Sequence, residues 1–188
     1  MSNGIERLIR LLIVPRRNHP TSIFRPSFEN RGPTFSKYGV SIRSVRSDQT
    51  SQSLTLHYCT DGEVQLRFSF KKNEYMVPIL LVLRALVQTS DKEIFERLTM
   101  GDYNNTFLID RVEMLLRGFR RFGFYEKNAA LEYLGSKFAV MLDSPEDSTE
   151  RQVGQEFLDR VVLVHLTESK DKFDLIMYFH HLIIDLLV

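Results

Sequence analysis

Three alternating segments, YGVSIRSVR (38–46), LTLHY (54–58) and VQLRFSF (64–70), decide the fold of this chain. Each alternates apolar with polar side chains, a period of two that is typical of half-buried antiparallel strands. Asp61-Gly62 lies between the last two segments, and this pair favours the tight turn of a β-hairpin. The stretch therefore predicts an antiparallel sheet with one apolar face, and that face needs a cover.

The apolar run ILLVLRALV (79–87) supplies the cover as a predicted buried helix, with Pro78 in its first turn. Further amphipathic periods follow, and Ser90 with Glu93 three residues later forms a capping-box pattern. They predict helices over about residues 90–101, 106–122, 128–138, 149–165 and 172–188. The sequence thus predicts an α+β fold, in which an antiparallel β-sheet in the N-terminal third packs with a mostly helical C-terminal two-thirds.

Composition is that of one globular domain, or of one domain with a short appendage. The 188 residues are 43% hydrophobic and 26% charged. The formal net charge is +1, but residues 1–50 hold nine Lys and Arg against three Asp and Glu. This local basic excess favours one anionic contact region. Cys59 is the single cysteine, so an intrachain disulfide and a multi-cysteine zinc site are excluded.

The spacing of candidate catalytic residues gives no complete site. His181 and Asp185 stand four residues apart, but two ligands on one apolar helix make no metal site without a third. Cys59 lies in a predicted strand, where a buried inert thiol is expected, and His57 and His165 fit satisfied structural roles better than catalytic ones. No phosphate-binding glycine loop occurs. The sequence therefore predicts no catalytic, metal-binding or cofactor-binding residue in this chain.

The N-terminal segment Ile5–Val14 is apolar but too short to span a bilayer, and no membrane role is predicted. We expect a strand or short helix that packs on something. An exposed apolar strand is an association hazard, so the isolated chain is predicted to self-associate. Four prolines between Pro15 and Pro33 predict an extended or looped stretch. The last helix is apolar on most sides and lacks a C-terminal cap, as in a piece of a larger protein.

Basic residues and phenylalanines interleave in the N-terminal third. Lys and Arg neutralise phosphates, and aromatic rings stack on unpaired bases. The same pattern also fits an ordinary solvated face, and both interpretations stay open from the residues alone. The members are Arg16, Arg17, Phe24, Arg25, Phe28, Arg31, Phe35, Lys37, Arg43 and Arg46.

Several segments resemble the second-largest subunit of multisubunit RNA polymerases. Asn3–Ile9 is similar to an Asn-Gly-x-Glu-Lys/Arg segment of that subunit. The other matching segments are similar to the eukaryotic RNA polymerase I version and cover essentially the whole chain: 16–20, 31–33, 37–46, 48–51, 56–58, 72–75, 90–95, 115–117, 133–138 and 164–166.

The resemblance implies the lobe domain, a module inserted within the protrusion domain of that subunit. Residues 1–14 would then be the crossing segment from the protrusion, and residues 15–188 the lobe, a fragment of a larger subunit. The parent enzyme is a nucleotidyltransferase that uses magnesium and nucleoside triphosphates to make ribosomal RNA precursor in the nucleolus, within the nucleus. Its catalytic aspartates lie in the largest subunit, so this chain is expected to be inactive alone and to hold no cofactor.

Two roles follow from the resemblance, and both can hold on opposite faces. One is a docking module for other polymerase I subunits: the largest subunit, a heterodimer resembling initiation factor F, and a small zinc-ribbon subunit. The other is a wall of the downstream DNA cleft, where Arg16, Arg17, Arg43 and Arg46 contact backbone phosphates. The alternative to both is a general nucleic-acid-binding or protein-interaction domain unrelated to polymerase.

Overall fold

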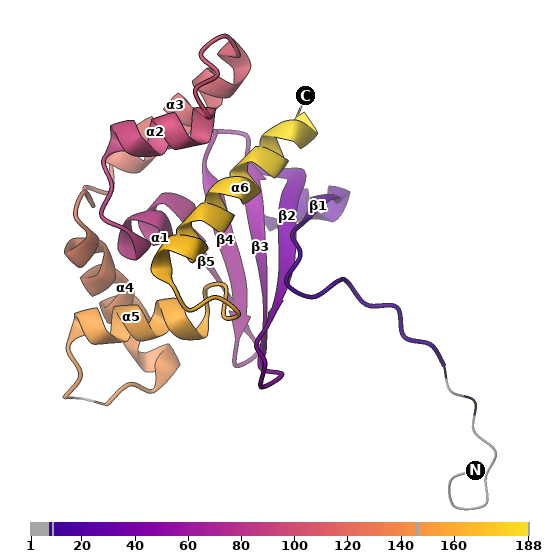
Figure 1. The fold of residues 1–188 in the computed structure, drawn as a ribbon, viewed down its shortest axis with the longest axis vertical. Helices are drawn as coiled ribbons and strands as arrows, with labels where there is room; N and C mark the ends of the chain where they lie inside the picture. The colour runs from indigo at the N-terminus through magenta and orange to yellow at the C-terminus, as the bar shows by residue number, and fades with distance from the viewer. Residues whose placement is uncertain (1–7, 9, 146, 188) are drawn as a thin grey trace, which may run out of the picture.

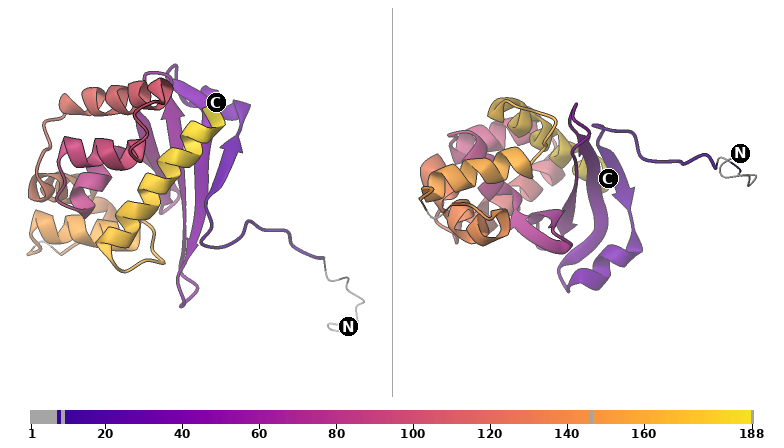
Figure 2. Two further views of the ribbon diagram at one scale, coloured as in Figure 1. Left: turned by 45° about the horizontal axis from the view of Figure 1, so that its top comes forward. Right: turned by 90° about the horizontal axis from the view of Figure 1, so that it is seen from below.

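The structure is a computed structural model that describes residues 8, 10–145 and 147–187. One antiparallel sheet stands beside a layer of α-helices (Figure 1), and the turned views show these α-helices on one face of the sheet (Figure 2). The predicted α+β fold is confirmed. The elements are β1 (Thr21–Phe24), the 3₁₀ helix η1 (Pro26–Arg31), β2 (Phe35–Val45), β3 (Ser51–Cys59), β4 (Val64–Phe70), β5 (Asn73–Pro78), α1 (Ile79–Leu86), α2 (Asp91–Thr99), α3 (Thr106–Arg120), α4 (Lys127–Leu142), α5 (Glu150–Arg160) and α6 (Ser169–Leu187).

The sheet has five strands in the order β1-β2-β3-β4-β5, with every neighbouring pair antiparallel. The three predicted strands are confirmed, and Val40, Leu56 and Leu66 face one another across them. Strands β1 and β5 were not predicted. The β4–β5 turn uses Lys71 and Lys72 at positive φ (48° and 70°), where sequence reasoning looks for Gly or Asn. Strand β1 has four residues, too few for an alternation to stand out.

The core lies between the sheet and the helices. All eight residues of α1 are buried, and Pro78 is the N-cap of this helix rather than a residue of its first turn. Aromatic rings from the sheet and two helices meet in this core. The rings of Phe138 on α4 and Phe157 on α5 stack with centroids 4.5 Å apart, and Phe68 on β4 meets Phe157 edge-on at 5.3 Å. Such contacts add to the apolar burial that joins the two layers.

Helix starts agree with the sequence better than helix ends do. Ser90 accepts a hydrogen bond from the Glu93 backbone N–H at the start of α2, so the predicted cap is confirmed. Helix α4 continues to Leu142, beyond the predicted end, whereas α5 stops at Arg160 and a buried turn follows. In that turn Leu163 takes a φ of +45°, so the chain does not resume the helical path there. Among the described residues, no helix is long and apolar enough to cross a membrane.

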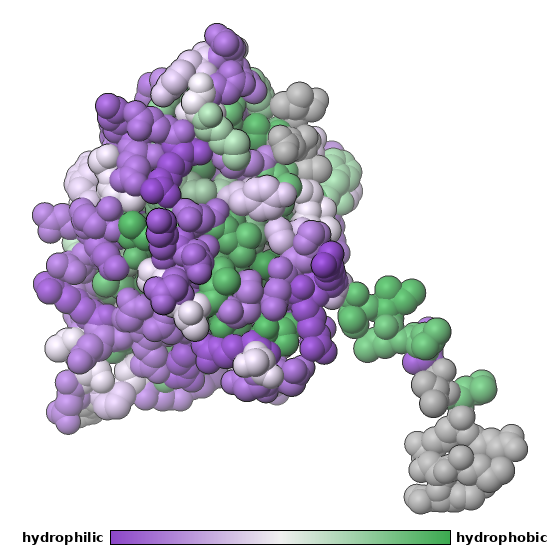
Figure 3. All heavy atoms as spheres, viewed as in Figure 1, coloured by the Kyte–Doolittle hydropathy of each residue, from purple (hydrophilic) through white to green (hydrophobic). Residues whose placement is uncertain are grey.

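The N-terminal segment departs from expectation. Residues 8 and 10–14 have no regular secondary structure, and the exposed fraction is 88% for Leu11 and 96% for Ile13. The apolar side chains project from the body of the molecule (Figure 3). The expected packed strand or helix is therefore wrong for these residues; residues 5–7 and 9 lie outside the described part. An apolar pattern predicts burial only where a surface is at hand to cover it, and these side chains remain in contact with solvent.

Candidate functional site

The face of the sheet opposite the helices is polar, and we call it the open face. It carries the side chains that alternate with the core residues. The register aligns Thr21, Ser41, Thr55, Arg67 and Met76 in one row across all five strands. Small hydroxyl side chains therefore occupy the β1–β3 part of this row. The alternation noted in the sequence places Arg43 of β2 and Arg67 of β4 on this same face.

A hollow of about 440 Å³ lies at the β1–β2 end of the open face. Arg43, half-buried, lines it. Asn18 fixes the preceding segment here: its backbone N–H donates to the Arg43 carbonyl at 2.9 Å, and its side chain bonds to both backbone groups of Val45 at 2.6 and 3.0 Å. This clamp holds Arg16 and Arg17 beside the same end of β2. The other lining residues are Pro15, His19, Thr21, Ile23, Ser41, Ser51 and Ser53.

The structure gives the four predicted contact arginines two different settings. Arg16 is exposed, and Arg17 is exposed and donates to Gln49 Oε1 at 2.9 Å. Arg46 instead turns its guanidinium toward the helices, where Nε donates to the Val164 carbonyl and Nη2 to the Asp159 carbonyl, each at 2.9 Å. Arg16, Arg17 and Arg43 thus gather at one end of β2, while Arg46 ties the sheet to the end of α5.

Charge compensation differs between the two sides of the molecule. In the described part of the chain, no carboxylate lies within 4.0 Å of five arginines of the N-terminal third: Arg16, Arg17, Arg25, Arg43 and Arg46. Most arginines of the helical layer are paired instead, as in Arg97 with Asp174 at 3.0 Å and Arg151 with Glu132 at 2.6 Å. Uncompensated positive charge therefore concentrates on the sheet side, where it can attract an external anion.

A second charged group was missed by sequence reasoning. Glu74 on β5 accepts Arg31 Nη1 at 2.8 Å and lies 3.0 Å from Arg67 Nη2. The hydrogen bond from Arg31 and the charge of Arg67 lower the pKa of Glu74, and burial followed by the charge of Arg31 lowers the pKa of Arg67. The polar face of the β4 alternation pointed to Arg67, but nothing local paired it with a residue of η1 and one of β5.

Two of the interleaved aromatic rings pack against His57 and are therefore not available to stack on nucleic-acid bases. Phe28 is buried and meets the ring of His57 at 4.4 Å, and Phe35 meets the same ring at 5.6 Å. Burial, with the charges of Arg31 and Arg67, lowers the pKa of His57 to about 4, so the ring is neutral near pH 7. Phe24 alone of the three is well exposed, at 58%. His57 is structural but not satisfied, since neither ring nitrogen has a hydrogen-bond partner among the described residues.

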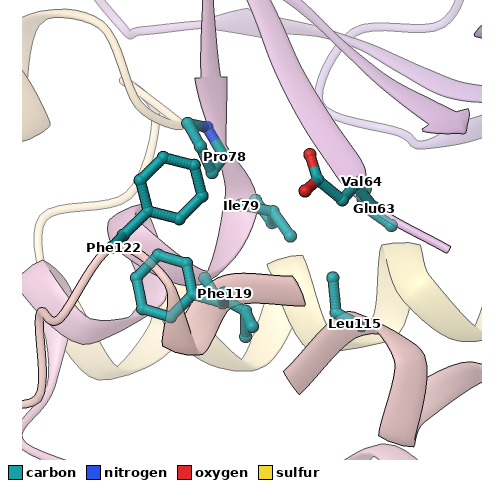
Figure 4. Close-up of a pocket in the computed structure, with 8 residues that line it drawn as sticks. Glu63, Val64, Pro78, Ile79, Leu115, Phe119 and Phe122 are labelled. Atoms are coloured by element: carbon teal, nitrogen blue, oxygen red, sulfur yellow. The ribbon is translucent and has the colours of Figure 1, made fainter. Parts of the chain in front are cut away.

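No described pocket combines a ligand-sized cavity with residues suited to catalysis. The crevice in Figure 4 joins Glu63 to Pro78, Phe119 and Phe122, and it holds about 10 Å³, the space of a single water. Glu63 forms an ion pair with Arg121 there. Burial raises the pKa of the Cys59 thiol to about 12, which makes it a poor nucleophile.

Metal-binding side chains do not assemble into a site either. Within the described residues, no three His, Cys, Asp or Glu side chains are grouped so that they could hold a metal ion. The side chain of Asp185, paired with His181 in the sequence, lies outside the described part. What the described residues offer is a surface for contact rather than a reaction centre.

Comparison with known proteins gives one consistent family. The model of the family described as RNA polymerase Rpb2, domain 2, matches residues 16–187. The chain is 55% identical over 176 residues to the probable DNA-directed RNA polymerase I subunit RPA2 of Schizosaccharomyces pombe. It is 53% identical over 180 residues to the DNA-directed RNA polymerase I subunit RPA135 of Saccharomyces cerevisiae, and 36% identical over 171 residues to human RPA2.

These matches cover 94%, 94% and 91% of this chain, but 15% of each relative. The chain therefore spans about 15% of the length of the relatives that it matches.

Proposed function

The chain belongs to the RNA polymerase Rpb2 domain 2 family, in the form found in RNA polymerase I, and from this premise we propose that it lines the path of DNA. In this proposal it is the non-catalytic lobe of the second-largest subunit. Its open face lies toward downstream DNA, and other surfaces hold neighbouring subunits. The segment up to residue 14 connects it to the rest of the subunit, and residues 15–188 form the lobe.

One observation carries the DNA-facing role: Arg16, Arg17 and Arg43 gather at one end of β2 without carboxylate partners in the described chain. Phosphate contacts need accessible, uncompensated cations, and they carry no sequence information. Small hydroxyl side chains line the hollow beside Arg43, and such groups can contact a phosphate backbone. Arg46 drops out of this surface, because its guanidinium already bonds to two backbone carbonyls.

The test is binding of the chain to a fluorescently labelled forked DNA, measured by anisotropy from about 50 to about 200 mM salt. We expect weak binding that falls steeply with salt. In the variant R16A/R17A/R43A the logarithmic salt slope should fall by about 0.9 for each phosphate that the protein no longer neutralises. Circular dichroism of the same variant checks that it is folded.

The matched control is the variant R117A/R120A/R151A, which removes three exposed arginines of the helical layer. It changes the net charge equally, so a general charge effect would weaken DNA binding as much as in the first variant. Equal weakening in the two variants, or no binding by the original chain at low salt, contradicts the proposed DNA-facing surface.

The family also favours docking of other polymerase subunits. We propose as partners the largest subunit, a heterodimer resembling initiation factor F and a small zinc-ribbon subunit, assembled in the nucleolus. The exposed aromatic side chains Tyr103, Tyr125 and Tyr178 supply contact area on the helical side. We also propose that the magnesium implied for the parent enzyme binds outside this chain.

A further inference from the structure

Strand β5 leaves one edge of the sheet unpaired. Lys71 and Lys72 join β4 to β5 as a two-residue turn, so Phe70 and Asn73 form a hydrogen-bonded pair. Hydrogen-bonded and non-bonded pairs alternate from there, and the N–H and C=O groups of Glu74 and Met76 face away from β4. In the described chain, no backbone group from another element bonds to these peptide groups. The edge thus offers donors and acceptors at the spacing of a strand.

An excess of positive charge lies beside this edge. The Glu74 side chain stands on the open face between Arg31 and Arg67, at 2.8 and 3.0 Å. The charge of Arg25 also acts on Arg67, and no described carboxylate lies within 4.0 Å of Arg25. Two guanidinium groups, those of Arg31 and Arg67, therefore share one carboxylate, and a third positive charge, that of Arg25, acts on Arg67. The arrangement shows that a carboxylate fits between Arg31 and Arg67, and it leaves charge for a further one.

From this edge and this charge together, we propose that β5 takes up an extended acidic segment of a protein partner as a further strand of the sheet. The main chain of the segment pairs with the outward groups of Glu74 and Met76. Every second side chain of an added strand points to the open face, so acidic residues at alternate positions reach Arg31 and Arg67. The intervening side chains lie toward the helical side, near the half-buried ring of Tyr75.

An acidic peptide fits these observations better than a nucleic acid does. Both could satisfy guanidinium groups, but a phosphate backbone cannot complete a β-ladder with peptide N–H and C=O groups. The carboxylate of Glu74 already occupies the position that the partner's carboxylates would share. The inference goes beyond the proposed DNA contacts, since it concerns β5, at the opposite edge of the sheet from β1.

The test uses a fluorescently labelled, end-blocked peptide of alternating Thr and Glu, and its affinity for the 188-residue chain is measured by anisotropy. Removal of one charge-assisted hydrogen bond corresponds to about a tenfold weaker affinity, which we expect for Arg31→Gln and for Arg67→Gln. Glu74→Gln removes the internal competitor and should tighten binding severalfold. The control Arg151→Gln removes an equivalent arginine, paired with Glu132 at 2.6 Å on the helical side, and should change nothing.

Strand addition has its own test. The same peptide with N-methyl groups on every second residue keeps its carboxylates but lacks the donors on one edge, and we expect it to bind far more weakly. Equal binding of the methylated peptide would contradict pairing with β5. If a short DNA duplex binds through Arg31 and Arg67 while the acidic peptide does not, the site belongs to nucleic acid and the inference is overturned. Neither result bears on Arg16, Arg17 and Arg43.

Discussion

Replacing Arg46 with alanine tests whether this side chain stabilises the fold or contacts DNA. The guanidinium donates two hydrogen bonds at 2.9 Å, to the carbonyls of Val164 and Asp159. These carbonyls lie at and just beyond the end of α5, where a positive charge also interacts favourably with the helix dipole. Hydrogen bonds from a charged donor contribute about 1.5–3 kcal/mol each when buried. Because the Arg46 side chain is exposed in part, we expect Arg46→Ala to lower the free energy of unfolding by about 2 kcal/mol in total.

For a chain of this size, that change lowers the melting temperature by about 4–8 °C. Differential scanning fluorimetry and urea unfolding measure the change, and anisotropy on forked DNA measures the affinity at a temperature where both proteins are folded. Arg16→Ala is the control: Arg16 is exposed, and we expect a stability change below about 0.5 kcal/mol together with weaker DNA binding. An Arg46→Ala protein that melts like the original chain but binds DNA more weakly would refute this reasoning.

Three further outcomes are expected. The pKa of His57 is lowered from 6.5 to about 4 in the folded chain, so its contribution to the free energy of unfolding is fully present above pH 6.5 and falls by about 2–3 kcal/mol as the pH drops toward 4. The variant His57→Phe should therefore show a flatter dependence of the urea midpoint on pH, and an unchanged slope would contradict this. A Cβ on Gly154 would lie 2.2 Å from the Leu131 carbonyl oxygen, so Gly154→Ala should destabilise the chain by about 3 kcal/mol. In Gly118→Ala the nearest contact of the new Cβ is at 3.5 Å, so this variant should be neutral or more stable by up to about 1 kcal/mol. Equal urea midpoints for the two variants would refute the close contact between helices α4 and α5. The exposed residues 10–14 should drive self-association that disappears when residues 1–14 are deleted, and sedimentation showing a monomer at high concentration would rule this out.

The candidate site was predictable in part. Alternation along β2 placed Arg43 on the polar face, and proximity in the sequence suggested Arg16 and Arg17 as its neighbours. The structure shows in addition that the Asn18 side chain bonds to the backbone of Val45. The backbone of Asn18 has a φ of +56°, a conformation that no local sequence pattern predicted. Arg46 looked equivalent to Arg43 by sequence, yet it bonds to a carbonyl 118 residues away. Its partner could not be inferred before α5 and its end were placed.

What the sequence by itself determined is the layering of this protein. The period-two segments, the Asp61-Gly62 turn and the apolar run after Pro78 required a sheet with one covered face, because alternation and helical periodicity are properties of neighbouring residues. What only the tertiary structure decided is which charges are compensated. Glu74 and Arg31 are separated by 43 residues, and their contact depends on the strand register and on how η1 crosses the open face. Coulomb energy follows distance in space, so the division between compensated and uncompensated charges became visible only once the chain was folded.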